Sequence, residues 1–195
     1  EITIGGRSIR TDPIACKREL AYIPDNPDLY DYMTGIRYLN FIADIFGVSA
    51  EVRGQRIHDY AARFELTDDL AQPIASYSHG MKQKLAIISA LLHEPKLILM
   101  DEPFSGSDLF NREDFYRVML GLLSDHETVI LSTHLLEEVK TFLSRAVLLR
   151  QGRLIGDISQ QEMEDEDLVT RVKQTYHYQA DRVRKALSQL PDEEG

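Results

Sequence analysis

The feature of this sequence that most constrains its fold is the apolar run at residues 97–100, which ends in two adjacent carboxylates, Asp101 and Glu102. A continuous apolar run of this length, bounded by charges and by Pro103, is typical of a strand buried in a parallel sheet. In open α/β sheets, ligands bind at the edge formed by the carboxyl ends of the strands. The sequence therefore predicts that both carboxylates lie at a ligand-binding edge.

Two further apolar runs, residues 128–131 and 146–149, are separated from the first by helical patterns. This alternation predicts a mostly parallel sheet that is covered by helices on both faces. The run at 128–131 is followed by a Ser-Thr-His sequence that ends at His134. The imidazole of His134 is therefore expected at the same sheet edge as the two carboxylates.

These three side chains suit phosphate chemistry. One carboxylate can hold Mg²⁺ directly or through water while its neighbour faces an attacking water. A neutral imidazole can donate a hydrogen bond to a terminal phosphate oxygen. Taken singly, each signal has a plainer interpretation, either a charged turn after a core strand or a structural histidine.

The chain before this sheet is predicted to begin with a hairpin that turns at Gly5-Gly6, followed by a short helix capped by Asp12 and a strand at residues 20–23. Residues 28–92 are then expected to be mostly helical. The predicted helices run from the cap Thr34 to Gly47, from the cap Ser49 to about Phe64, and over residues 79–92.

The last of these helices begins in the sequence Ser78-His79-Gly80-Met81. Serine and glycine at a helix N-terminus leave backbone N–H groups close to any anion, and the helix dipole favours negative charge there. A plain N-cap is the commoner use of such a serine. The order of the motifs favours the anion-binding interpretation, because this helix comes directly before the strand that carries the carboxylates.

In this order the motifs resemble those of the ABC ATPase family over residues 1–159. The resemblance implies an α/β fold with a P-loop NTPase-like, mostly parallel sheet and an ABC-type helical subdomain. It also implies that Asp101 organises Mg²⁺, that Glu102 activates water and that His134 is the switch histidine. Asp108 lies in a segment similar to the D-loop, although a serine stands at 107 where leucine is usual.

Ser78 and Gly80 resemble the signature motif, normally Leu-Ser-Gly-Gly-Gln, which completes the ATP site of a second copy. Asp25 stands where the Q-loop generally has glutamine; its carboxylate cannot donate a hydrogen bond as an amide can, although it could coordinate Mg²⁺. The implied domains are a partial N-terminal sheet with the Q-loop at 1–27, the helical subdomain at 28–92, the ATPase core at 93–158 and an acidic extension at 159–195.

No Gly-x-x-x-x-Gly-Lys-Ser/Thr sequence occurs in the chain. In the family this P-loop lies shortly before the region that begins at Glu1, so the chain is expected to be truncated just after the P-loop and to be inactive by itself. Loss of the P-loop helix and of at least one strand is also expected to expose apolar sheet surface and to promote self-association.

The composition excludes some classes of function. The chain has 32 acidic and 22 basic residues, a net charge of −10 that argues against nucleic-acid binding. Its single cysteine, Cys16, cannot form an internal disulfide, which favours a cytosolic setting. The resemblance implies an ATP- and Mg²⁺-dependent motor of an exporter at the cytoplasmic face of the membrane, paired with a transmembrane permease and a second nucleotide-binding domain. The alternative is a soluble ABC-type regulatory or non-catalytic interaction module.

Overall fold

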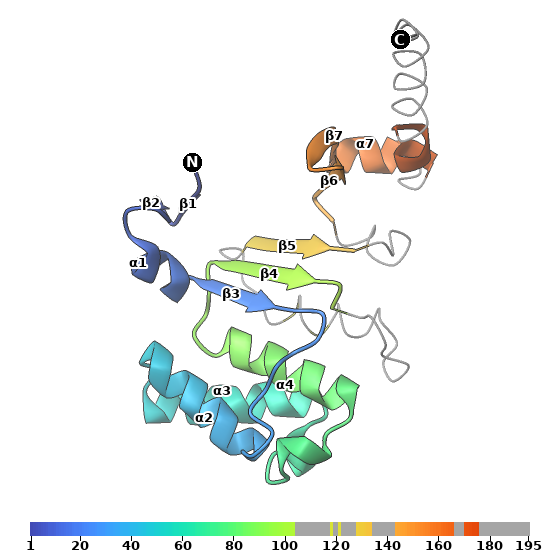
Figure 1. Cartoon of the computed structure of the whole chain (residues 1–195). Coiled ribbons are helices and arrows are strands. Elements are labelled where there is room, and N and C mark those ends of the chain that lie inside the picture. The colour runs from blue at the N-terminus through green and yellow to red at the C-terminus, as the bar shows by residue number, and fades with distance from the viewer. Residues whose placement is uncertain (104–117, 119–120, 122–127, 134–142, 166–169, 176–195) are drawn as a thin grey trace, which may run out of the picture. The chain divides into compact units, whose positions relative to one another are not determined.

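The computed structural model describes residues 1–103, 128–133, 143–165 and 170–175, together with positions 118 and 121. The chain divides into two compact units, Glu1–His134 and Leu135–Gly195. The elements of the first unit are β1 (Thr3–Ile4), β2 (Arg7–Ser8), α1 (Pro13–Arg18), β3 (Leu20–Ile23), α2 (Gly35–Phe46), α3 (Ala50–Arg63), two short 3₁₀ helices (Thr67–Asp69 and Ile74–Ser76), α4 (His79–Leu91), β4 (Leu97–Asp101) and β5 (Thr128–Ser132) (Figure 1). Those of the second are β6 (Arg145–Arg150), β7 (Arg153–Ser159) and α7 (Gln160–Asp165).

The centre of the first unit is a parallel sheet of β3, β4 and β5, in that order. Met100 of β4 pairs with Ile23 on one side and with Leu131 on the other, so the three strands end level with one another. The predicted strands at 20–23, 97–100 and 128–131 and their parallel arrangement are thus confirmed. Because the strands are level, the residues that follow them leave the sheet at a common edge.

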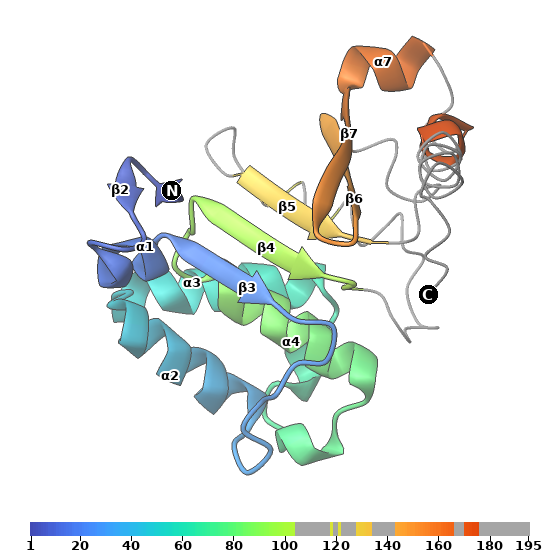
Figure 2. The same ribbon diagram turned by 45° about the horizontal axis from the view of Figure 1, so that its top comes forward.

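One face of this sheet is buried against α4. Ala21, Ile23, Ile98 and Met100 point to this side and are almost inaccessible to solvent. Residues 85–92 of the α4 segment are buried as well, because α4 contacts the sheet on one side and α2 on the other. Figure 2 shows this arrangement, with α4 beneath the strands and α2 farther from them. The core of the unit lies in these two layers.

The opposite face of the sheet, termed the open face, is less buried by the described residues. Tyr22, Leu99 and Ile130 are register neighbours across the three strands, and the side chains of Tyr22 and Ile130 are 57% and 56% exposed. Most residues between β4 and β5 lie outside the described part of the chain, so the prediction that helices cover both faces, like the expected exposure of apolar sheet surface, stays a prediction for this side. The buried residues of β3 and β4 pack on the side of α4, whereas Tyr22 and Ile130 on the other side are exposed.

The helical region follows the predicted boundaries closely because its caps are made locally. The hydroxyls of Thr34 and Ser49 accept N–H groups of Arg37 and Val52, each at 3.4 Å, at the starts of α2 and α3. Helix α2 ends at Gly47, which adopts a left-handed conformation with φ of 72°. Within the described part of the chain, no helix is long and apolar enough to cross a membrane.

The N-terminal hairpin also forms as predicted. Gly5 and Gly6 connect β1 and β2 with φ angles of 56° and 78°, the left-handed values that a two-residue hairpin turn requires. Asp12 then caps α1 by accepting the N–H of Ala15 at 3.4 Å. Gly5 is further constrained because a Cβ there would lie 2.0 Å from Oε2 of Glu19.

The run at residues 146–149 differs from its prediction. It lies in β6, which pairs antiparallel with β7 in a two-stranded sheet instead of joining the parallel sheet. Gln151 and Gly152 make a tight turn, both with positive φ, and this connection brings the next segment back as the partner strand. Ala146 and Leu148 are buried with Ile158, so the apolar run serves a small local core.

Candidate active site

The two predicted carboxylates lie where β4 leaves the sheet. Asp101 is the last residue of β4 and is exposed, while Glu102 is half-buried. Glu102 has a φ of 41°, a left-handed conformation that is uncommon for a residue with a side chain. Its N–H donates to the carbonyl oxygen of Ser132 at 3.1 Å. This backbone bond joins the turn after β4 to the end of β5.

Ser132, the last residue of β5, completes this edge. It stands opposite Asp101 in the parallel register, and its hydroxyl oxygen lies 2.5 Å from Oδ1 of Asp101. Sequence reasoning used this segment only to place His134 and missed the serine. The available signal was its position at the end of a strand predicted to lie in the same sheet as the carboxylates.

The signature-like segment begins α4. Ser78 is exposed and caps the helix, its hydroxyl accepting the N–H of Met81 at 3.2 Å. By helix geometry the N–H groups of His79 and Gly80 have no partner within the helix. No atom of the described chain comes within 4 Å of a Cβ built at Gly80. The cap interpretation is thus confirmed, and the first turn of α4 remains accessible to an outside group.

Helix α4 and strand β4 run in opposite directions, because a short loop joins the end of the helix to the start of the strand. Figure 2 shows that the N-terminus of α4 and the C-terminal end of β4 consequently lie at the same end of the unit. Asp25 belongs to this end too, as an exposed residue in the loop that follows β3. The structure therefore brings Ser78, Gly80, Asp25 and the β4 carboxylates to one end of the sheet.

Two contacts that the sequence did not predict join α4 to the loop after β3. The side-chain amide of Gln83 donates to the carbonyl oxygen of Pro24 at 3.4 Å, and Nζ of Lys82 lies 2.8 Å from Oδ1 of Asp31. Gln83 is buried, with only 5% of its surface exposed. These contacts set the position of the Asp25 loop relative to the first turns of α4.

The predicted switch histidine, His134, and the D-loop residue Asp108 lie outside the described residues. Their proposed positions at the sheet edge stay predictions. The neighbouring Thr133 is described and is half-buried directly after β5.

The donors at the β4 edge fit the chemistry of Mg²⁺. Carboxylate and hydroxyl oxygens are the hard ligands that Mg²⁺ prefers, and it is usually held by one or two carboxylates together with phosphate oxygens and water. Within the described part of the chain, no group of three or more His, Cys, Asp or Glu side chains could hold a metal ion. The edge therefore offers part of a coordination sphere, which phosphate and water would complete.

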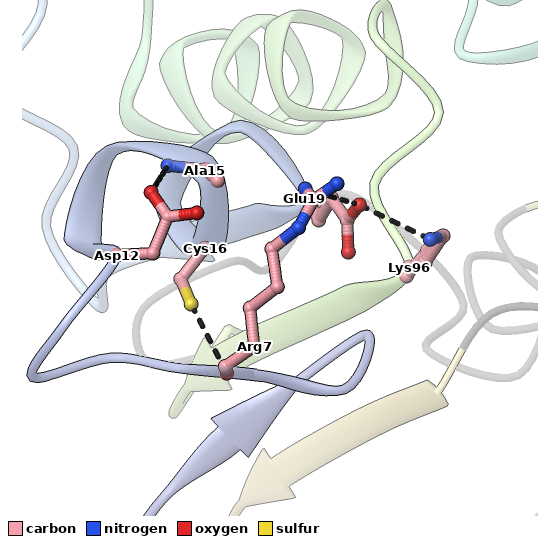
Figure 3. A network of polar contacts seen from close by, with 6 residues as sticks. All are labelled: Arg7, Asp12, Ala15, Cys16, Glu19 and Lys96. Carbon is pink, nitrogen blue, oxygen red and sulfur yellow. Dashed lines mark hydrogen bonds and ion pairs between the residues drawn. The ribbon is translucent and has the colours of Figure 1, made fainter.

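A second polar cluster lies at the opposite edge of the sheet (Figure 3). Oε1 of Glu19 accepts from Nη1 of Arg7 at 3.3 Å and from Nζ of Lys96 at 3.1 Å. Glu19 precedes β3 and Lys96 precedes β4, so these ion pairs lie at the amino ends of the strands. Oε2 of the same carboxylate is buried and has no hydrogen-bond partner. The two ion pairs tie the N-terminal hairpin to the sheet.

Comparison with known proteins agrees with this geometry. The sequence model of the family described as "ABC transporter" matches residues 1–105. An uncharacterised ABC transporter ATP-binding protein of Nostoc is 32% identical over 84% of this chain and 48% of its own length. The ABC transporter ATP-binding protein NatA of Bacillus subtilis is 30% identical over 79% of this chain and 63% of its own length.

A solved structure of an ATP-binding subunit of an ABC transporter superposes with a TM-score of 0.76 at 30% identity, covering 84% of this chain and 68% of that one. The chain spans about half to two thirds of the length of the two curated relatives. The family match covers more than half of the chain and includes α4, β4 and the two carboxylates. The chain belongs to the ABC transporter family, as its ATP-binding part.

Proposed function

We propose that this chain is part of the ATP-hydrolysing motor of an ABC exporter. The observation that carries the proposal is the edge of the parallel sheet, where β4 presents Asp101 and Glu102 at the same end of the unit as the N-terminus of α4. The carboxylates combine a metal ligand with a general base, and the N–H groups at the start of α4 supply donors for the phosphate of a second copy.

Each residue then has a distinct role. Asp101 holds Mg²⁺, which neutralises phosphate charge and positions the nucleotide when bound. Glu102 accepts the proton of the attacking water. His134 donates a hydrogen bond to the terminal phosphate as charge develops, while Asp25 and Asp108 line the same site.

Ser78 and Gly80 act on the ATP of a second copy of the domain. The open space at Gly80 supports this role, because no described contact within the chain requires glycine there. An approaching phosphate would meet backbone N–H groups and the positive end of the helix dipole. In a chain with the P-loop restored and in the Glu102→Gln background, Ser78→Arg should block ATP-dependent dimerisation, measured by sedimentation, without abolishing ATP binding by one copy. Dimerisation of normal affinity would contradict the role in trans.

The helical subdomain, residues 28–92, faces a transmembrane permease on the cytoplasmic side of the membrane. Its exposed aromatic surface supports this partner. The rings of Tyr30 and Tyr32 stack at a centroid distance of 5.8 Å, and Phe41 of α2 lies 5.7 Å from Tyr30. All three side chains are exposed, and such clustered apolar surface is characteristic of protein contacts. Residues 1–27 and 93–158 form the ATPase core, and 159–195 an acidic extension.

The 195-residue chain alone should not bind ATP with useful affinity. A P-loop supplies backbone N–H donors, a lysine and a Mg²⁺-binding hydroxyl, whereas the β4 edge presents two anions to another anion. Losing three charge-assisted hydrogen bonds of about 1.5–3 kcal/mol each removes several decades of affinity. Titration calorimetry with Mg-ATP is the measurement, and a dissociation constant in the micromolar range would contradict the proposal for the isolated chain.

The catalytic assignment is tested in a fusion that places the P-loop segment of a longer relative before Glu1. Glu102→Gln should bind ATP but hydrolyse it about 10²- to 10⁴-fold more slowly, because the amide cannot accept a proton from water. Glu65→Gln is the matched control, since Glu65 is another glutamate with positive φ, in an exposed position after α3. Equal turnover of the Glu102 variant and this control would remove Glu102 from its role.

A further inference from the structure

Ser132 makes contacts with three successive residues at the end of β4. Its hydroxyl oxygen lies 2.5 Å from Oδ1 of Asp101 and 3.5 Å from the carbonyl oxygen of Met100. Its own carbonyl oxygen accepts the N–H of Glu102 at 3.1 Å. Among the described residues, Ser132 supplies the hydrogen bond to the Asp101 carboxylate. Ser132 is thus the residue that joins β5 to both acidic positions.

The hydroxyl has one hydrogen to donate, and the distances indicate where it goes. The Met100 carbonyl is at the limit of hydrogen bonding, whereas the contact with the carboxylate is short. A donated bond to Oδ1 restricts rotation of an otherwise exposed carboxylate and leaves Oδ2 for another group. Ser132 is itself held in place, because its backbone is paired with Asp101 in the sheet.

The backbone of Ser132 restrains the conformation of Glu102. The left-handed turn at Glu102 departs from the conformations that side-chain-bearing residues prefer. Such a turn persists where surrounding contacts hold it, and the bond to the Ser132 carbonyl is a contact of that kind. One residue therefore sets the direction of the chain after β4 through its backbone and the orientation of Asp101 through its side chain.

We infer that Ser132 is a positioning residue whose hydroxyl orients the Asp101 carboxylate for a divalent cation. The chemical class of the ligand rests on the proposed function, since Mg²⁺ would accompany the nucleotide. The geometric role does not depend on ATP. Partners of this kind, which hydrogen-bond to a metal ligand without binding the metal, orient the ligand before the metal arrives.

The test compares threonine and valine at position 132 in the complete 195-residue chain. The two side chains have nearly the same shape and both suit a strand, but only threonine retains the hydroxyl. Mn²⁺ without nucleotide is the probe, and paramagnetic broadening of the amide signals of Asp101 and Glu102 in NMR spectra reports its binding. Asp101→Asn provides the baseline for ions attracted elsewhere by the negative chain.

The wild-type chain should show saturable broadening at Asp101 that Asp101→Asn removes. Ser132→Val should weaken the Mn²⁺ affinity by roughly 10-fold, and Ser132→Thr should restore most of it. Ser132→Ala serves if the valine variant does not fold. Equal Mn²⁺ affinity of the valine variant and the wild type, equal losses in both variants, or no localised broadening in the wild type would each overturn the inference.

These outcomes are independent of catalysis. A chain in which Ser132 controls Mn²⁺ binding but the fusion shows no effect of Glu102→Gln would retain this inference and lose the proposed ATPase role. The reverse result would retain the ATPase role and remove Ser132 from the positioning of Asp101.

Discussion

The two faces of the parallel sheet are built from the same strands but have opposite environments. On one face Ile98 and Met100 are buried against α4, whereas on the other Tyr22 and Ile130 are more than half exposed. Strand geometry sends alternate side chains to opposite faces. In these strands the side chains on both faces are apolar. The difference teaches that packing on α4, and not the apolar character of the strands, determines which residues stabilise this unit.

The same comparison separates stability from function. The buried face holds the strands level, and level strands bring Asp101 and Ser132 together at the edge. The open face contributes little to that alignment. We therefore expect substitutions to lower the free energy of unfolding most on the buried face, less at the carboxyl-end edge and least on the open face.

The largest effect is expected at Ile98, whose side chain is completely buried. Ile98→Thr keeps a β-branched side chain but replaces a buried ethyl group with a hydroxyl. This change should lower the free energy of unfolding by about 2–4 kcal/mol. Urea denaturation followed by circular dichroism measures the loss. A loss below that of the same substitution on the open face would break the comparison.

A smaller effect is expected at the edge, where Glu102 has a φ of 41°. Glycine adopts this conformation readily while alanine does not, so Glu102→Gly should be about 1 kcal/mol more stable than Glu102→Ala. Both variants lack the carboxylate, so the difference in their free energies of unfolding reflects the backbone conformation. Equal stability in urea would show that the turn is not strained.

The stability of the chain is expected to depend on pH through His93, which follows the C-terminal end of α4. The ring of His93 stacks on Phe46 at a centroid distance of 3.7 Å. Burial lowers the pKa of His93 from its ordinary 6.5; the nearby backbone of Leu20 opposes this shift, and the charge of Arg56 adds to it. As pH falls below 6.5, the unfolded chain binds a proton that the folded chain resists, so stability decreases until the lower folded pKa is reached.

This decrease cannot exceed about 1.4 kcal/mol per pH unit for one group. His93→Phe retains an aromatic stack without a titrating group and should flatten the slope between pH 6.5 and 5. The exposed His58 is the control, and His58→Phe should leave the slope unchanged. An unaltered slope in the His93 variant would contradict the assignment.

Local signals made most of the first unit predictable from the sequence. Thr34, Ser49 and Ser78 each cap the helix expected of them, because capping involves only the next three residues. The runs at 97–100 and 128–131 became parallel strands. The run at 146–149 was assigned to the wrong sheet, since apolar character does not reveal the partner strand and the turn at Gln151-Gly152 favoured a hairpin.

The site was predictable to the extent that residue type and strand ends define it. Asp101 and Glu102 were found because carboxylates after a buried strand are a strong pattern. The hydroxyl of Ser132 and the contact between Gln83 and Pro24 were missed, because they depend on register and on packing between segments distant in sequence.

The smallest effect on stability is expected at Ile130, on the open face. Ile130→Thr retains strand propensity and replaces an ethyl group with a hydroxyl at a residue that is already 56% exposed, so the free energy of unfolding should change by no more than about 0.5 kcal/mol. Association should respond more strongly, because Tyr22 and Ile130 form part of one exposed apolar row and self-association through such a surface depends on its apolar area. Sedimentation of the wild type and the variant at several concentrations measures this. A variant that unfolds as readily as Ile98→Thr would show that the open face is packed in solution, and unchanged association would show that the chain associates through another surface.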